Sequence, residues 1–288
     1  MIRLKFSIEL HYSVLQSGAD FIFSIHAAQT AQQTVVSEML TLNQTLPHSL
    51  YTDPLTHTRY LRLKADAGPL TVHYEATVDL NHVTAQPEQL AEVSVASLPG
   101  HVLPFLYPSR YCQSDRLVRL AIKEFGHLWQ GYSRVQAIRD WVQSRITFQP
   151  NSSNGNTTAV DTLVEEVGVC RDFAHLMIAL CRAVNIPARF ATGIDYGASP
   201  SLGPTDFHAY VEVYLGDRWY IFDPSGVAIP MGFLRFGTGR DAADAAFATI
   251  FGNVQGSAPV IQIEAAPNAQ GLLVLPQHVT YALSTDGL

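Results

Sequence analysis

Residues 168–189, GVCRDFAHLMIALCRAVNIPAR, place a cysteine immediately before an apolar helical pattern. The apolar residues recur at the i, i+3, i+4 spacing of a buried helix face: Phe173, Leu176, Met177, Leu180 and Val184. Cys170 therefore lies at the N-terminus of a predicted helix, where unpaired N–H groups and the helix dipole favour a thiolate. Because the thiolate is the nucleophilic form of cysteine, Cys170 is a candidate catalytic nucleophile.

Residues 206–226, DFHAYVEVYLGDRWYIFDPSG, predict a β-hairpin. Residues 207–215 alternate in the period of two that is typical of a strand, and the Gly-Asp pair at 216–217 suits a two-residue type II′ turn. That turn fixes the register of the two strands, so Tyr210 is expected to oppose Asp223.

In this register Asp223 is diagonal to His208 on the same sheet face, within reach of its imidazole. If the helix N-terminus packs against that face, Cys170, His208 and Asp223 form a triad. The cysteine attacks, the histidine accepts and later returns the proton, and the aspartate fixes the imidazole tautomer. The backbone N–H of Cys170 would contact the oxyanion. Candidates for a second donor lie upstream: Trp141, Gln149 and Asn151.

Each of these residues also has a structural interpretation. A free cysteine is commonly a buried core residue, a strand histidine can be a satisfied packing residue, and an aspartate before proline can begin a turn. A zinc site at Cys170, His208 and Asp223 would lack further ligands, since no CxxC or HExxH motif is nearby.

Composition limits the kinds of core, partner and cellular location that the chain is expected to have. The 288 residues are 47% hydrophobic and 15% charged, which predicts a sizeable core, and the net charge of −7 argues against nucleic acid or an anionic membrane as partner. Three cysteines suggest no disulfide framework and fit a reducing compartment. We find no apolar signal-peptide region and no apolar stretch of 18 residues, so the expected location is the cytoplasm.

The chain is predicted to contain two domains. Residues 1–104 show period-two alternation in several segments and predict an N-terminal β-sandwich-like domain. Prolines and glycines between 98 and 114 indicate the linker, and residues 105–288 predict an α+β core. Trp129 and Trp141 are expected to pack between helices. Further elements are expected at 114–128, 133–146, 159–167 (helices), 188–194, 260–264 and 272–283 (strands).

The cysteine and hairpin segments resemble the transglutaminase-like superfamily of papain-type cysteine enzymes, as does GRDAADA at 239–245. The resemblance covers roughly residues 105–255, and the N-terminal region is similar to the β-domain that precedes this core in many bacterial members. The segment after 241 departs from the acidic, proline-containing run usual in the family.

The resemblance implies a papain-like α+β core in which the nucleophile helix packs on an antiparallel sheet. It implies Cys170, His208 and Asp223 as the catalytic triad, acting on a peptide or protein substrate without cofactor or metal. The expected function is a cysteine protease or amidase. Amine transfer of the transglutaminase type and a non-catalytic interaction module are the alternatives, and no acidic loop suggests the calcium-dependent cross-linking subtype.

Overall fold

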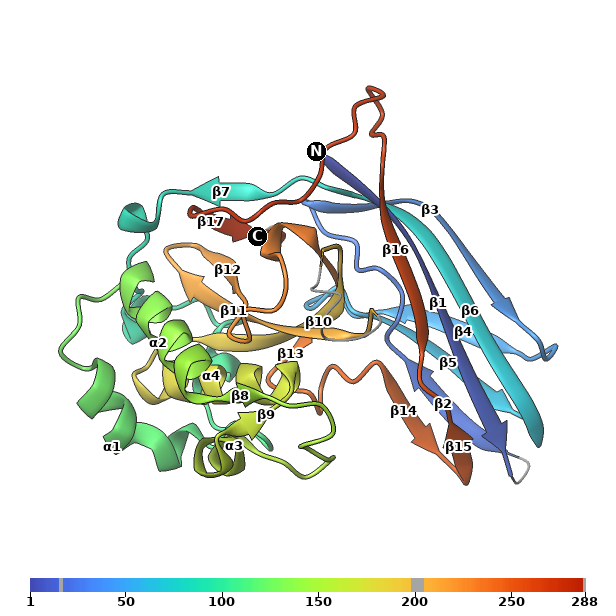
Figure 1. Ribbon diagram of the computed structural model, residues 1–288, viewed down its shortest axis with the longest axis horizontal. Coiled ribbons are helices and arrows are strands. Elements are labelled where there is room, and N and C mark those ends of the chain that lie inside the picture. Colours follow the sequence, from blue (N-terminus) through green and yellow to red (C-terminus); the bar gives the residue numbers. More distant parts are fainter. Residues whose placement is uncertain (16–17, 198–204, 287–288) are drawn as a thin grey trace.

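The computed structural model describes residues 1–15, 18–197 and 205–286 of the chain. Two sheets packed face to face form one half of the molecule, and helices around a third sheet form the other half (Figure 1). The predicted α+β class, with an N-terminal β-domain, is confirmed.

The helices are α1 (Ser114–Phe125), α2 (Tyr132–Arg145), α3 (Ala159–Glu165) and α4 (Cys170–Ala183). The strands of the two packed sheets are β1 (Ile2–Val14), β2 (Ala19–Phe23), β3 (Gln33–Leu42), β4 (His48–Thr52), β5 (Arg59–Ala65), β6 (Gly68–Leu80), β14 (Ala248–Phe251), β15 (Val254–Gly256) and β16 (Val260–Ala266). The other strands are β7 (Val83–Ala85), β8 (Thr147–Phe148), β9 (Val167–Gly168), β10 (Ala188–Asp195), β11 (His208–Leu215), β12 (Arg218–Phe222), β13 (Phe233–Gly239) and β17 (Ala282–Ser284).

The sandwich follows from alternation in its long strands. Every second residue of β1 is buried, and β6 pairs with β1 along its whole length with the same alternation. Strands β2 and β5 bury the same kind of face in the second sheet, and the inward side chains of both sheets form one core. Burial of apolar surface between the two sheets therefore holds this half together.

The C-terminal strands return to the sandwich. Strand β14 pairs with β2, and β15 and β16 pair with β1 on the edge that β6 leaves free. The predicted division assigned all of residues 105–288 to the second domain, whereas residues 248–266 lie in the sheets of the first. The physical reason is that an open strand edge has unpaired N–H and C=O groups, which these strands satisfy.

The third sheet has the order β12-β11-β10-β13 and is antiparallel throughout. Helix α4 packs on the face formed by Ala209, Val211 and Val213, and the other helices surround α4. The short parallel pair β8–β9 lies immediately before α4 in the chain. This sheet and α4 position the candidate site.

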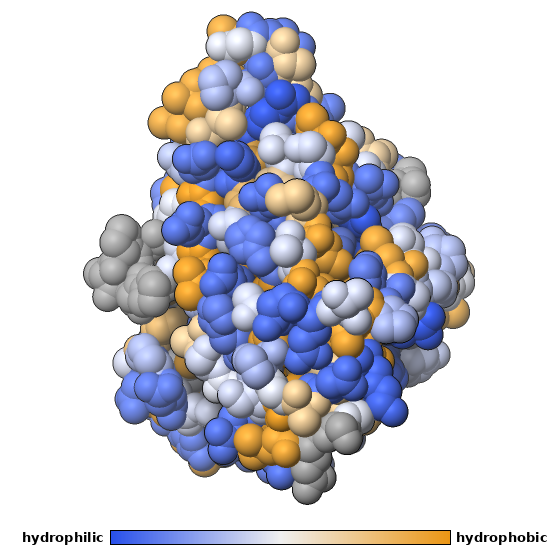
Figure 2. All heavy atoms as spheres, turned by 90° about the vertical axis from the view of Figure 1, so that its right-hand side faces the viewer, coloured by the Kyte–Doolittle hydropathy of each residue, from blue (hydrophilic) through white to orange (hydrophobic). Residues whose placement is uncertain are grey.

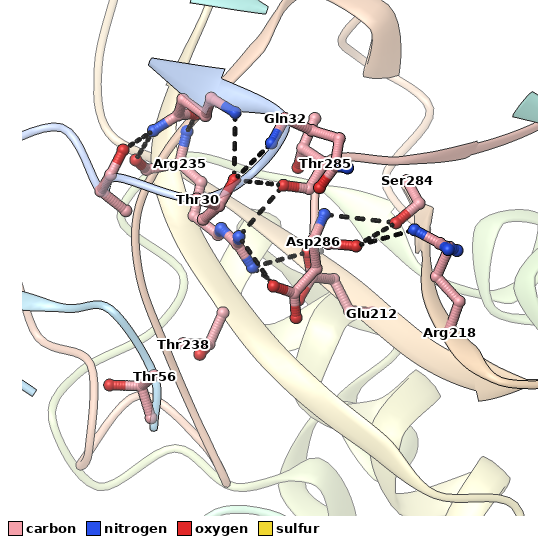
Figure 3. A network of polar contacts seen from close by, with 12 residues as sticks. Thr30, Gln32, Thr56, Glu212, Arg218, Arg235, Thr238, Ser284, Thr285 and Asp286 are labelled. Atoms are coloured by element: carbon pink, nitrogen blue, oxygen red, sulfur yellow. Dashed lines mark hydrogen bonds and ion pairs between the residues drawn. The ribbon is translucent and has the colours of Figure 1, made fainter. Parts of the chain in front are cut away.

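The C-terminal tail closes a buried polar cluster on the other face of β11 (Figure 3). Arg235 and Glu212 are 1% and 0% exposed, and Arg235 Nη1 lies 3.3 Å from Glu212 Oε1. Arg189 Nε donates to Glu212 Oε2 at 2.7 Å. The Asp286 carboxylate pairs with both arginines. We call these four residues the Glu212 cluster.

Two local expectations are wrong. Trp129 was expected to pack between helices but is 86% exposed, because it lies after the end of α1 in the irregular connection to α2. Trp141 does pack between helices, edge to face with Phe125. The predicted strand at 260–264 is confirmed, but residues 272–281 are irregular and only Ala282–Ser284 pair, with β7.

Figure 2 views the sandwich end of the molecule, where apolar side chains are interspersed with polar ones. Strand β4 is exposed at all five of its residues. Single apolar residues scattered on a surface are normal. Within the described residues, none of the helices has the length and apolar character needed to cross a membrane.

Candidate active site

Cys170 is the first residue of α4, one residue after β9. Asp172 Oδ2 accepts a hydrogen bond from the backbone N–H of Val169 at 2.9 Å, which fixes the first helical turn. Gly168 allows this turn to approach, because a Cβ there would lie 2.8 Å from the Asp172 Cβ. The Cys170 thiol is partly exposed, and its Sγ lies 4.0 Å from the carbonyl oxygen of Phe207.

The other two thiols have a different environment. Cys112 and Cys181 are fully buried, and burial raises the pKa of Cys112 to about 12 and the pKa of Cys181 further still. Both thiols are therefore held in the protonated, unreactive form. Cys170 alone of the three combines a helix N-terminus with access to solvent.

The hairpin has the predicted register. Leu215 pairs with Arg218, and Val211 pairs with Phe222. His208 therefore lies diagonal to Asp223, as expected, and its Nε2 is 3.6 Å from Asp223 Oδ1. This separation is longer than a hydrogen bond, as is common in a site without substrate.

The triad was predicted on the condition that the helix N-terminus packs against the His208 face. The body of α4 instead covers the opposite, wholly apolar face of β11. Its apolar stripe requires an apolar partner surface, which the His208 face does not offer. Because His208 is the first residue of β11, the helix N-terminus still brings the thiol to the end of the strand that carries the imidazole, 4.0 Å from the carbonyl oxygen of the adjacent Phe207.

Asp223 is held firmly. Its Oδ1 accepts hydrogen bonds from the Ser225 hydroxyl at 2.6 Å and the Ser225 backbone N–H at 2.9 Å, and its Oδ2 accepts from Ala228 N–H at 3.1 Å. Burial alone would raise the pKa of Asp223, but the contact with His208 and these donors lower it below its usual range. Asp223 therefore stays ionised near neutral pH.

A second carboxylate, which sequence reasoning missed, lies on the other side of the imidazole. Asp195 is the last residue of β10, is 2% exposed, and places Oδ2 3.6 Å from His208 Nδ1. Its Oδ1 accepts a hydrogen bond from the Tyr210 hydroxyl at 2.6 Å. Burial raises the pKa of Asp195 to about 6, against the charge of His208 and the Tyr210 hydrogen bond.

His208 thus lies between two carboxylates and a thiol. Burial would lower its pKa, but the Asp195 charge, then Cys170 and Asp223, raise the pKa of His208 well above its usual value. The arrangement favours an imidazolium beside Cys170, which is the partner that a thiolate requires.

The strand register contains the signal that could have found Asp195. Gly193 pairs with His208 across β10 and β11, so Asp195 is diagonal to His208 on the same face. The sequence interpretation ended this strand at Ile194 and began a loop at 195. Residues 198–204 of that predicted loop lie outside the described residues.

Three further residues occupy structural positions. Arg171 donates to the Asn154 carbonyl at 2.6 Å and pairs with Asp172, so it anchors the loop before α3. Trp141, a candidate oxyanion donor, packs on Phe125 instead. Asp172 orients the first turn of α4.

Comparisons with known proteins agree with this architecture. Residues 124–224 match the Transglutaminase-like superfamily, and residues 2–101 match the Bacterial transglutaminase, N-terminal domain. An uncharacterised Mycobacterium leprae protein is 25% identical over 191 residues, which are 64% of this chain and 68% of that protein. The uncharacterised protein YebA of Bacillus subtilis is 24% identical over 205 residues, 63% of this chain but only 27% of its own length.

Among solved structures, a candidate cysteine protease from Cytophaga hutchinsonii is 39% identical, with a TM-score of 0.90. The match covers 98% of this chain and 97% of that protein, so it includes both the sandwich and the core. Together with the two family matches, this similarity shows that the chain belongs to the transglutaminase-like superfamily.

Proposed function

We propose that the protein is a cysteine-nucleophile enzyme that cleaves peptide or other amide bonds through a thioester on Cys170. One observation carries the proposal: a partly exposed thiol at a helix N-terminus lies at the end of the strand that begins with His208, and the Nε2 atom of this histidine faces Asp223 Oδ1 at 3.6 Å. The likeness to a candidate cysteine protease, over nearly the whole of both chains, supports it.

In the proposed reaction the Cys170 thiolate attacks the amide carbonyl carbon. The tetrahedral oxyanion is stabilised by the backbone N–H of Cys170, which has no acceptor within its own helix because it belongs to the first turn. The C–N bond then breaks, and the His208 imidazolium gives its proton to the leaving amine. Asp223 keeps the imidazole oriented throughout.

Water completes the cycle. The neutral His208 takes a proton from water, the hydroxide adds to the thioester carbonyl, and the C–S bond breaks to release a carboxylic acid and the thiolate. A primary amine in place of water would give transglutaminase-type transfer through the same thioester. The two outcomes differ only in the acceptor, so the test must measure the product.

The first experiment measures the pH dependence of Cys170 alkylation by iodoacetamide, resolved by site with mass spectrometry. A free cysteine has a pKa of about 8.5. We expect rapid alkylation of Cys170 well below this pH, lost in His208→Ala. Cys112 and Cys181 serve as internal controls, because both are buried. Alkylation of Cys170 as slow as theirs would contradict the proposal and favour a non-catalytic interaction module.

The second experiment identifies the acceptor. A peptide library is incubated with the parent and with Cys170→Ala, and new termini are sought by mass spectrometry. A parallel reaction contains a glutamine-bearing protein and a labelled primary amine. Cys170-dependent new termini support hydrolysis, whereas Cys170-dependent label without cleavage would replace it with amine transfer.

A further inference from the structure

Asp195 and Asp223 bind the same imidazole from opposite sides, but their surroundings are unequal. Asp223 accepts three hydrogen bonds besides its contact with His208. From the described residues Asp195 accepts one, from the hydroxyl of Tyr210, whose fully buried ring packs on Phe233 of β13. Two buried carboxylates therefore share one imidazole, and only one of them is well supported.

The charges around the His208 imidazole do not balance. The titratable side chains that face it are Cys170 from α4, His208 and Tyr210 from β11, Asp195 from β10 and Asp223 after β12. His208 supplies the one positive charge among these side chains. With a thiolate and both carboxylates ionised, the site would carry three negative charges, two of them buried, against one positive charge, which is costly in a poorly solvated site.

We propose that Asp195 is a positioning residue of the Cys170 centre, in which its carboxylate, held by Tyr210, faces His208 Nδ1 opposite Asp223 and controls how firmly the imidazole keeps its proton. This inference rests on the proposed function, since it concerns the same Cys170–His208 pair. The ionised Asp195 stabilises the imidazolium and repels a thiolate, whereas the neutral form does neither.

The control that Asp195 exerts on His208 operates in a defined pH range. Burial raises the pKa of Asp195 to about 6, while Asp223 remains ionised. Asp195 therefore changes charge near pH 6, and the Cys170–His208 pair responds to it. Two carboxylates whose environments separate their titrations are a recurrent way to divide roles within one site.

The test follows the His208 ring nitrogens by NMR across pH, together with the pH dependence of Cys170 alkylation. In Asp195→Asn we expect the midpoint of the His208 titration to fall by at least about one pH unit. The onset of Cys170 alkylation moves to lower pH in the same variant, because a repelling charge next to the thiolate has gone.

Tyr210→Phe is the second variant. It removes the hydrogen bond that stabilises the Asp195 anion, so the carboxylate is neutral over a wider range and the His208 midpoint falls by a smaller amount. Asp195→Glu is expected to restore part of the loss. Asp241→Asn is the matched control, because Asp241 is 1% exposed but binds the backbone of Tyr111 and Ala243 instead of His208.

A His208 midpoint in folded Asp195→Asn that stays within about 0.3 pH units of the parent would overturn the inference, since a neighbouring charge shifts a titration by more than that. If Asp195→Asn does not fold, an unchanged midpoint in Tyr210→Phe has the same meaning. Failure of the proposed function is a separate result: His208→Ala would then leave Cys170 alkylation unchanged.

Discussion

Two polar clusters lie on one face of strand β11, four residues apart, and they are built in opposite ways. The Glu212 cluster pairs Arg189 and Arg235 with Glu212 and Asp286, so its charges balance. Figure 3 shows Arg235, Glu212 and Asp286 of this cluster. The cluster around His208 has two carboxylates, each 3.6 Å from one nitrogen of the imidazole, and the thiol of Cys170. A closed, balanced network holds elements in place, whereas an unbalanced one leaves groups free to change their protonation. On one strand, the Glu212 cluster therefore has a structural role, whereas the groups around His208 have a chemical one.

The largest effect is expected at Asp223. Asp223→Ala removes the ionised partner of the imidazole, and we expect kcat/KM for a peptide identified in the library screen to fall by roughly 10²- to 10⁴-fold. Steady-state kinetics of the folded variant measure this. A loss below about threefold would mean that Asp195, rather than Asp223, supports the imidazole.

Glu212→Ala is expected to affect stability instead. It leaves two buried arginines, Arg235 and Arg189, sharing the single carboxylate of Asp286, so the free energy of unfolding should fall by about 3–5 kcal/mol, measured by urea denaturation. The double variant Glu212→Leu with Arg235→Met should lose less than the sum of the two single changes. Full additivity would contradict the coupling between Glu212 and Arg235. A changed Cys170 alkylation profile in folded Glu212→Ala would contradict the separation of the two clusters.

Asp286 makes the stabilisation by the Glu212 cluster depend on pH. Burial opposes ionisation, but Arg235 and then Arg189 lower the pKa of Asp286 to about 2. Because the folded pKa lies below the unfolded value, the stabilisation is present above about pH 4 and is lost as the pH falls towards 2. Parent and Asp286→Asn should therefore differ by roughly 2–3 kcal/mol at pH 7 and converge at pH 2 in urea denaturation. A constant difference across that range would argue against the ion pairs.

The smallest effect is expected at the rim of the same cluster. Arg218 is half-buried and donates to the Asp286 carbonyl at a long 3.4 Å. Arg218→Ala should change the free energy of unfolding by less than about 1 kcal/mol, because a partly solvated contact contributes little. A cost equal to that of Glu212→Ala would place Arg218 inside the closed network.

Local pattern predicted most of the framework that carries the site. The alternation of β1, the start of α4 at Cys170 and the register between β11 and β12 all depend on short-range rules, namely side-chain period, helix termini and turn length. These rules are sufficient to bring His208 next to Asp223. Each of these rules acts within about twenty consecutive residues, so a single sequence is enough to apply it.

Features that depend on three-dimensional packing were missed. Alternation alone does not say which sheet face receives a helix, so the face that α4 covers could be stated only as a condition. The role of Asp195 appears only when β10 is paired with β11, and the sequence interpretation ended the strand one residue earlier. Trp129 was expected to be packed because of its residue type, but it lies exposed in the connection between α1 and α2. For the helix face and for Asp195, a contact between distant segments decided the outcome.

Strands β14, β15 and β16 return to the sandwich after the helical core has been built. The chain leaves the first half, builds the helical core, and then comes back to cover the edges of β1 and β2. A fragment cut after residue 104 would expose both edges as templates for intermolecular pairing. The complementary fragment would contain three strands without their sheets. A cut at the apparent linker therefore separates the sandwich from strands that complete it, so the linker does not mark a boundary between two self-contained halves.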